Sequence, residues 1–274
     1  MSLANLLEQI RQERGLDLEL YKRTFLERRL AIRMHARGCA DYTAYASLLR
    51  AEPAEYEPLL NALRIHVTRF FRDESTFDAL RQKILPALIQ AARPQRRLRC
   101  WCAGAASGEE PYSLAILLSS LLGAELPAWQ VCIEATDIDP RSIERGRRGV
   151  YPAHSFKDLT PQYQRLVDQY LPLVDGHHTA APRLKALVSF AVHDLTRDAC
   201  QPDLDLLMCR NVLIYFDRLQ QERLYQCFRQ VIRPQGVLVL GKSEILPLNW
   251  SARFVALDLR EHIYRRAASS TGAV

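Results

Sequence analysis

Two adjacent glutamates at the end of a run of small residues are the first feature of this chain that could bind a charged ligand. The segment CAGAASGEEPYS, residues 102–113, lies between a short apolar run and a longer apolar stretch that is typical of a helix. In open α/β sheets, a loop that leaves a strand and enters a helix binds ligands, because free backbone N–H groups and the helix dipole converge there. The glycines and alanines allow a ligand to approach the backbone closely.

Glu109 and Glu110 decide which ligand suits this loop. The helix dipole would attract a pyrophosphate, but the two carboxylates would repel it, so a ligand with a positive end is favoured. S-adenosylmethionine carries an ammonium and a sulfonium and meets this requirement. The G-x-G-x-x-G spacing of dinucleotide-binding loops is absent, which argues against a nicotinamide cofactor. Alternatively, both glutamates only complement the helix N-terminus, at about 0.3 to 1 kcal/mol each.

Two further acids stand where predicted strands end. Asp137, in ATDID, is placed to accept hydrogen bonds from the hydroxyl groups of a ribose. Asp194, in AVHDL, could accept a hydrogen bond from an adenine amino group, or it could cap a helix that begins in TRDA. Strand-end acids of this kind support nucleoside binding without choosing the cofactor.

The cysteines form no recognisable metal site. They are an odd number, 7, and are scattered through apolar stretches rather than grouped at the spacing of metal ligands. Cys100 and Cys102 form only a C-x-C pair, whose side chains point to one face of a strand. We therefore expect no bound metal and free, buried thiols at Cys39, Cys100, Cys102, Cys132, Cys200, Cys209 and Cys227.

Composition limits the class of protein and of partner. The chain has 274 residues, 48% hydrophobic and 25% charged, with a formal net charge of +6. No apolar run approaches the roughly 18 residues of a membrane span, and MSLANLLEQIRQERG is typical of an amphipathic helix rather than a signal peptide. We expect a soluble, cytoplasmic protein of two domains. The charge favours an acidic partner, which could be nucleic acid, a membrane surface or an acidic protein.

Residues 1–66 are predicted to be helical, with no strand. One helical stripe consists of Leu18, Tyr21, Phe25 and Ile32. Gly38 is placed to end that helix, and Asp41 to cap a further helix.

From about residue 96, short β-like runs alternate with helices, which indicates a mainly parallel sheet covered on both faces. The predicted strands are 98–103, 129–137, 187–194, 204–209 and 236–241, with one or two closing strands in FVALDLREHIYRR. Helices are predicted from Glu110 to Leu122 and from Arg218 to Ile232, the latter stopped by RPQG. The interval between VYPAHSF and Leu187 exceeds what a crossover requires, so we expect a small inserted subdomain.

Four ordered motifs carry a family resemblance. TRFFRDE (68–74), CAGAASGEEPYSLAILL (102–118), ATDIDPRSIERGRRGVY (135–151) and CRNVLIYFD (209–217) resemble the chemotaxis receptor glutamate O-methyltransferases of the CheR type. The resemblance covers nearly the whole chain. It implies an all-helical N-terminal domain, 1–66, as a candidate receptor-binding domain. It further implies an α/β domain, 67–270, of the class I S-adenosylmethionine-dependent methyltransferases, with a mainly parallel, doubly wound sheet and a small β subdomain inserted at about 153–187.

The resemblance also implies site residues. The implied cofactor positions are His66, Thr68, Arg72, Glu110, Asp137, Asp194, Leu195, Arg210 and Asn211. His66 and Asp194 each stand where the family commonly has Asn. Aspartate can still accept from an adenine amino group, so the second change is mild, whereas the first leaves the role of position 66 open.

The implied reaction transfers the sulfonium methyl to a glutamate carboxylate of a receptor helix, giving a methyl ester and S-adenosylhomocysteine. A carboxylate with a pKa of about 4.3 is ionised at neutral pH, so no general base is required. Arg72 and Tyr215 are expected to orient this carboxylate, since the family pattern puts both near the methyl group. Alternatively, Tyr215 packs in the core and Arg72 pairs with Asp73 or Glu74.

A basic stripe is predicted on the second helix. Lys22, Arg29, Arg33 and Arg37 recur in one narrow sector with no acidic partner at matching spacing. Such a run is usually a solvated surface. The functional alternative is a patch that meets acidic methylation-site helices of a chemoreceptor and raises the association rate. Nucleic acid is disfavoured, because few aromatic residues are interleaved with the basic ones.

The expected partner is the cytoplasmic helices of methyl-accepting chemoreceptors, bound by a monomer that does not insert into the membrane. Two alternatives remain open: a methyltransferase for another protein or a small carboxylate, and a silent sensor that binds the cofactor and regulates a partner. The presence of Arg72 and Tyr215 argues against the sensor. The insertion is rich in Ala and Pro, so no receptor tail peptide is assigned to it.

Overall fold

The computed structural model describes residues 1–14, 18, 21–63, 68–199 and 203–268. The chain divides into two units. Met1–Ile65 and Tyr215–Glu222 form the helical unit, and His66–Ile214 and Arg223–Val274 form the sheet unit.

The helical unit is built from α1 (Leu3–Arg14), α2 (Arg23–Ala36), α3 (Tyr42–Ala51), η1 (Pro53–Glu55) and α4 (Tyr56–Leu63). Its core is a single cluster of buried side chains, among them Leu6, Ile10, Leu26, Leu30, Tyr45, Leu49 and Leu59. Asp41 caps α3 as predicted, because its Oδ1 accepts the Ala44 N–H at 2.8 Å. Gly38, with φ of 66°, follows the end of α2.

The predicted stripe on α2 is wrong. Tyr21 precedes the helix, which begins at Arg23, and forms an isolated antiparallel bridge with Phe216. Ile32 is 51% exposed, because α2 turns a different face inward and buries Phe25, Leu26 and Leu30.

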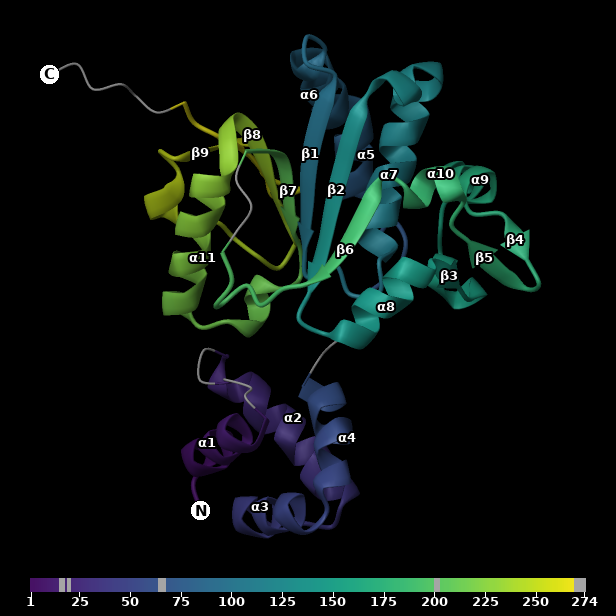
Figure 1. Cartoon of the computed structure of the whole chain (residues 1–274). Coiled ribbons are helices and arrows are strands. Elements are labelled where there is room, and N and C mark those ends of the chain that lie inside the picture. Colours follow the sequence, from purple (N-terminus) through teal and green to yellow (C-terminus); the bar gives the residue numbers. More distant parts are fainter. Residues whose placement is uncertain (15–17, 19–20, 64–67, 200–202, 269–274) are drawn as a thin grey trace, which may run out of the picture. The chain divides into compact units, whose positions relative to one another are not determined.

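The sheet unit contains a seven-stranded sheet in the order β6-β2-β1-β7-β8-β10-β9 (Figure 1). The strands are β1 (Arg97–Ala103), β2 (Gln130–Asp137), β6 (Val188–Val192), β7 (Leu204–Cys209), β8 (Ile232–Leu240), β9 (Phe254–Asp258) and β10 (Ile263–Arg266). The first five pair in parallel, and β10 is antiparallel to β8 and β9. The predicted mainly parallel sheet is confirmed.

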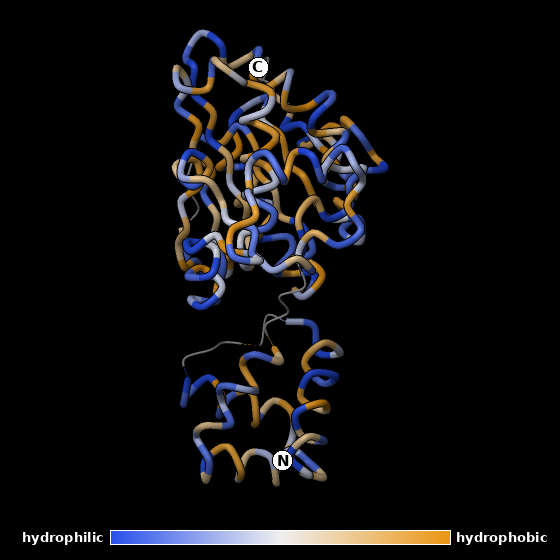
Figure 2. Tube along the Cα trace, turned by 90° about the vertical axis from the view of Figure 1, so that its right-hand side faces the viewer, coloured by the Kyte–Doolittle hydropathy of each residue, from blue (hydrophilic) through white to orange (hydrophobic). Residues whose placement is uncertain are grey.

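Helices cover both faces of this sheet. One face packs on α5 (Glu74–Ala79), the π-helical turn η2 (Leu80–Ile84), α6 (Leu85–Ala92) and α7 (Glu109–Leu122). Alternate residues of β1 point the other way, where the Trp101 ring meets Phe228 of α11 (Arg218–Val231) edge-on at 6.4 Å. Hydrophobic residues follow the interior strands and helices of this unit, as Figure 2 shows.

Helix α7 is the core helix of the sheet unit. Among the described residues, only Glu109–Ala128, which is α7 with the turn η3 (Gly123–Ala128), is long and apolar enough to span a membrane, and 56% of that window is buried within the protein. It packs on β2 and β6. Burial against the sheet therefore accounts for its apolar character.

A small subdomain lies between β2 and β6 in the chain. After α8 (Pro140–Arg148), it contains β3 (Val150–Tyr151), η4 (Ala153–Phe156), α9 (Pro161–Tyr170), β4 (Leu173–Val174), β5 (His177–Thr179) and α10 (Pro182–Lys185). The three strands form an antiparallel sheet in the order β3-β5-β4. This sheet begins at Val150, slightly before the predicted boundary.

Two details of the prediction need correction. RPQG does not separate α11 from the next strand, since β8 starts at Ile232 and its register against β7 shifts between Leu204 and Leu206, so the extra residues bulge out. The cysteines are not all free and buried: Cys132 is exposed on an outward position of β2, Cys39 is half-buried and Cys227 is disulfide-bonded.

The remaining cysteines are simpler. Cys100, Cys102 and Cys209 are free and buried, and burial raises the pKa of each thiol. Cys200 lies outside the described residues. Within the described ranges, no group of three or more His, Cys, Asp or Glu residues is arranged to hold a metal ion.

Candidate cofactor site and active site

The loop after β1 requires glycine at two positions. Gly104 and Ala105 donate to the Thr136 carbonyl at the end of β2, both at 2.8 Å. A Cβ on Gly104 would lie 2.3 Å from Val212 Cγ2, and one on Gly108 would lie 2.7 Å from Tyr151 Oη. Both glycines also have positive φ, 77° and 99°. The loop is therefore tight because neighbouring segments leave no room for side chains.

The two adjacent glutamates face different partners. Glu109 is 4% exposed and accepts a hydrogen bond from Ser107 Oγ at 2.9 Å, while burial raises its pKa. Glu110 instead pairs with Arg210, the residue that follows β7, at 3.0 Å. Burial raises the pKa of Glu110, and the Arg210 guanidinium opposes that shift.

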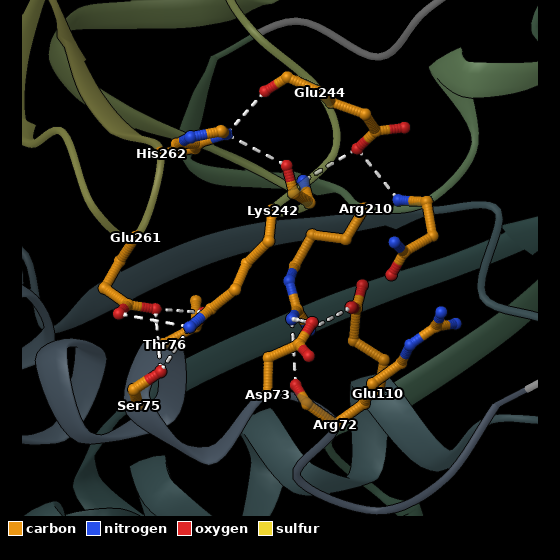
Figure 3. Close-up of polar contacts among 12 residues, drawn as sticks. Arg72, Asp73, Ser75, Thr76, Glu110, Arg210, Lys242, Glu244, Glu261 and His262 are labelled. Carbon is orange, nitrogen blue, oxygen red and sulfur yellow. Dashed lines mark hydrogen bonds and ion pairs between the residues drawn. The ribbon is translucent and has the colours of Figure 1, made fainter.

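Arg210 is the centre of the site (Figure 3). Its side chain is 1% exposed. Nη1 donates to Glu110, and Nη2 donates to the Asp73 carboxylate and to the Arg72 carbonyl, both at 2.8 Å. One buried guanidinium thus joins two carboxylates from segments that are far apart in sequence. Its Nε is buried and has no partner among the described residues.

The segment before Arg72 is anchored by two phenylalanines. Phe70 stacks on Phe156 of the small subdomain at 4.5 Å, and Phe71 stacks on Tyr163 at 4.3 Å. Phe71 and Asp73 have φ of 49° and 60°, an uncommon region for these residues. Packing on both sides and the bond from Arg210 hold this strained backbone in place.

Asp137 closes the loop as well as ending β2. It is 9% exposed, and its two oxygens accept the Ala106 and Asp139 N–H groups, each at 2.9 Å. Each oxygen keeps a second lone pair for another donor such as a ribose hydroxyl. The sequence did not predict that Asp137 closes this loop.

Asp194 caps a turn of its own chain. Its Oδ1 accepts the N–H and hydroxyl of Thr196, at 2.9 and 2.7 Å. Residues 194–199 form a turn rather than the helix considered as an alternative. Leu195 is half-buried in this turn. Thr68 is half-buried, and His66 lies outside the described residues.

Comparison with known proteins shows which family this chain belongs to. Residues 66–263 match the family model described as CheR methyltransferase, SAM binding domain, and residues 1–63 match CheR methyltransferase, all-alpha domain. The chain belongs to the CheR methyltransferase family. It is 35% identical over 243 residues to the chemotaxis protein methyltransferase of Salmonella typhimurium, covering 86% of this chain and 80% of that one. It is 32% identical over 237 residues to that of Listeria monocytogenes, covering 86% of each chain.

The CheR resemblance and the predicted fold class are thereby confirmed, and S-adenosylmethionine is the cofactor. The residues present fit a cationic nucleoside. Glu110 and Asp137 end or follow strands that stop at one edge of the sheet, since β1 and β2 pair up to Ala103 and Thr136. Near them, among the described residues, Arg210 Nε is a buried donor without a hydrogen-bond partner.

Tyr215 belongs to the helical unit of this CheR protein. It ends the turn η5 (Leu213–Tyr215), its carbonyl accepts the Lys22 N–H at 2.8 Å, and its ring lies 5.0 Å from Phe25. These contacts agree with the alternative in which Tyr215 packs in the core. Its role toward the substrate stays a prediction.

The basic stripe has acidic partners, although none at matching spacing along α2. Arg33 contacts the buried Glu55 carboxylate at 2.6 Å, and Arg37 contacts Glu52 and Glu55. Both acids come from the segment at η1, so spacing along α2 could not reveal them. Of the other two, Arg29 is half-buried with its guanidinium 5.9 Å from the Phe25 ring, and Lys22 is exposed.

Sequence reasoning missed two residues of this site. Asp73 was considered only as a partner of Arg72, yet the structure pairs it with Arg210. Glu244 received no role, although its carboxylate contacts the loop that follows Arg210 (Figure 3). The only sequence signal for Glu244 is an acid soon after a buried strand.

Proposed function

We propose that this CheR protein methylates glutamate side-chain carboxylates of chemoreceptors in the cytoplasm, giving glutamate methyl esters and S-adenosylhomocysteine in signal adaptation. The cluster around Arg210 is the observation that carries this proposal. It joins the Arg72–Asp73 segment to Glu110 at the edge of the sheet where the cofactor acids gather. The names of the Salmonella and Listeria relatives support the chemotaxis setting.

The cofactor positions proposed are Thr68, Arg72, Glu110, Asp137, Asp194, Leu195, Arg210 and Asn211, with His66 carried over from the family pattern alone. S-adenosylmethionine supplies, when bound, an electrophilic methyl group on a sulfonium. The carboxylate of Glu110 favours the cationic ligand, and Asp137 offers lone pairs to ribose hydroxyls. Burial strengthens both contributions, because little water competes at the site.

Arg72 and Tyr215 are the proposed orienting residues. The substrate carboxylate is ionised at neutral pH, so the protein has only to hold it in line with the methyl group. Correct placement of two reactants supplies on the order of 7 kcal/mol or more. The planar guanidinium of Arg72 matches a carboxylate, and the strained, anchored backbone around it limits its freedom.

The helical unit is the proposed docking element for the acidic receptor helices. Since Glu55 and Glu52 neutralise Arg33 and Arg37, and Arg29 is half-buried, the exposed charge of the stripe lies mainly at Lys22. We keep all four residues in the proposed contact surface, with Lys22 as its most accessible member. Electrostatic attraction of this kind acts mainly on the association rate.

The test is methyl transfer to a purified receptor cytoplasmic fragment. With methyl-labelled S-adenosylmethionine, the proposal expects label that is released as methanol by mild base and that maps to glutamates by mass spectrometry. Label that resists base, or label on other side chains, would refute glutamate ester formation. Cofactor binding without any incorporation would favour a regulatory protein instead.

A further inference from the structure

Glu244 is a buried carboxylate that the proposed reaction does not use. It is 4% exposed and lies in the turn Gly241–Glu244 that follows β8. Strands β7 and β8 are parallel neighbours whose last pair is Cys209 and Leu240. The segment that begins with Arg210 and the turn that holds Glu244 therefore leave the sheet side by side.

The Glu244 carboxylate accepts five backbone N–H groups. Oε1 accepts those of Val212 and Leu213 at 2.7 Å and that of Ile214 at 3.3 Å. Oε2 accepts those of Asn211 at 2.8 Å and Gly241 at 2.7 Å. Successive N–H groups that converge on one anion fix the path of the backbone that carries them. Residues 211–214 are thus held in one conformation by a single side chain.

This conformation needs support. Asn211 has φ of 61°, in the left-handed region that few residues adopt without compensation. Gly241 lies so close that a Cβ there would be 2.8 Å from both Asn211 N and Glu244 Oε2. The tight fit shows that the turn and the loop pack backbone to backbone.

His262 holds the turn from its other side (Figure 3). Its Nδ1 lies 2.6 Å from the Glu244 carbonyl oxygen and 3.0 Å from that of Gly241. Both neighbours are acceptors, so Nδ1 must carry a proton to bond them. The carboxylate therefore sits on an anchored turn rather than on a free one.

We infer that Glu244 is a positioning residue that sets Asn211 and the Arg210 guanidinium for cofactor binding. The inference rests on the proposed cofactor role of Arg210 and Asn211. The guanidinium reaches Glu110, Asp73 and the Arg72 carbonyl only if the backbone at position 210 is fixed. If residues 211–214 lost their fixed conformation, the position of the Arg210 guanidinium would vary, although the sheet would stay folded.

The variant Glu244→Gln tests this inference. An amide accepts at one terminal atom only, so its NH2 group must face either two or three of the five N–H donors. We expect a dissociation constant for S-adenosylhomocysteine at least 10-fold higher than that of the wild type, measured by isothermal titration at a temperature where circular dichroism shows a folded protein. The KM for S-adenosylmethionine should rise similarly, with kcat within about 3-fold.

Asp205→Asn is the matched control. Asp205 is also a buried carboxylate, 2% exposed, but it lies near the start of β7, where it accepts the Arg99 N–H at 2.7 Å and pairs with Arg233 at 2.6 Å. Loss of this carboxylate should lower the melting temperature. The dissociation constant for S-adenosylhomocysteine should stay within 2-fold of the wild-type value. If Asp205→Asn raises the constant as much as Glu244→Gln does, general destabilisation explains both, and the inference fails.

Two further variants settle the remaining outcomes. If Glu244→Gln does not fold, His262→Asn decides the matter, with an expected rise of at least 3-fold in the dissociation constant and an unchanged constant as the contrary result. Arg210→Lys separates the inference from the proposed site. An effect of Arg210→Lys without one of Glu244→Gln overturns the inference alone, and an effect of neither overturns the cofactor role of this loop.

Discussion

At the scale of single residues, one buried guanidinium compensates the charge of two carboxylates in the site. Arg210 contacts both Glu110 and Asp73 from a side chain that is 1% exposed. Removing one partner of such a buried group leaves the other uncompensated, which costs several kcal/mol in typical cases, about 3 to 5. The two carboxylates therefore stabilise the structure of the site and also give it negative charge.

The proposed catalytic role of Arg72 predicts a selective loss. Arg72→Ala should lower kcat by 10-fold or more, about 1.4 kcal/mol of transition-state stabilisation, because the substrate carboxylate loses its orienting fork. The affinity for S-adenosylhomocysteine should change by no more than a few-fold. Arg69→Ala is the control, since the Arg69 side chain is 47% exposed in the same segment and lies 3.9 Å from the exposed Asp158 carboxylate. Equal single-turnover rates for Arg72→Ala and Arg69→Ala would refute the role.

Glu110 predicts a pH dependence of cofactor affinity. Burial raises its pKa above the ordinary value of 4.5, so the protonated form of the free protein persists to higher pH. The ionised form attracts the cationic ligand, and binding should release a proton. Affinity for S-adenosylmethionine is thus present above the raised pKa and is lost as pH falls through it.

Isothermal titration between pH 8 and pH 5 measures this dependence. Glu110→Gln should bind about 10-fold more weakly than the wild type at pH 7 and show a flatter pH profile. A Glu110→Gln variant that binds S-adenosylmethionine as tightly as the wild type at pH 7 would contradict the assignment of Glu110.

At the scale of elements, parallel strands bring the site together. Pairs such as Cys102 with Met208 and Ala103 with Thr136 place the ends of β1, β2 and β7 at one edge. Asp137 is the last residue of β2, Arg210 directly follows β7, and Glu110 lies in the first turn of α7. The approximate positions of the strand ends could be read from the sequence, and the proposed site at this edge follows from the rule that such sheets bind ligands at the carboxyl ends of their strands.

The sequence did not reveal contacts between segments. Three contacts join residues that lie far apart in the chain. Arg210 pairs with Asp73, Arg33 pairs with Glu55, and backbone N–H groups of a distant loop converge on Glu244. Local periodicity contains no information on such partners. For the same reason the apolar stripe of α2 was predicted on a face that leaves Ile32 exposed.

The pairing of Arg33 predicts a stability effect in the helical unit. Glu55 is buried and accepts from Arg33 and from Tyr45 Oη, at 2.6 and 3.0 Å. Arg33→Ala should therefore lower the free energy of unfolding by about 1 to 3 kcal/mol, because it removes a partner of a buried charge. Glu8→Ala is the control for an exposed pair, with an expected loss below about 1 kcal/mol. Equal effects in urea denaturation would contradict this account of Glu55.

The receptor-docking proposal is best tested at Lys22. Lys22→Glu should raise the KM for a receptor fragment several-fold at low ionic strength, and the effect should shrink in high salt because the charge is exposed. Arg11→Glu makes the same charge change on the exposed surface of α1 and should have a smaller effect. If neither variant alters KM at low salt, the stripe is ordinary surface.

At the scale of the whole molecule, the two units match the two family models, one over residues 1–63 and one over 66–263. The sheet unit contains the carboxylates, the tight glycines and Arg210, so cofactor binding is expected to reside there. The helical unit contributes the basic stripe, and the segment Tyr215–Glu222 groups with it despite its distance in sequence. The proposed division of labour is thus a cofactor unit and a receptor-docking unit.

A crystal structure of the protein with S-adenosylhomocysteine tests the central claim most directly. The account predicts the adenosyl group at the carboxyl edge of β1 and β2, with ribose oxygens within hydrogen-bond distance of Asp137 and the amino acid end beside Glu110 and Arg210. A ligand bound elsewhere on the molecule, or an orientation that leaves Asp137 and Glu110 without contact to it, would contradict the account.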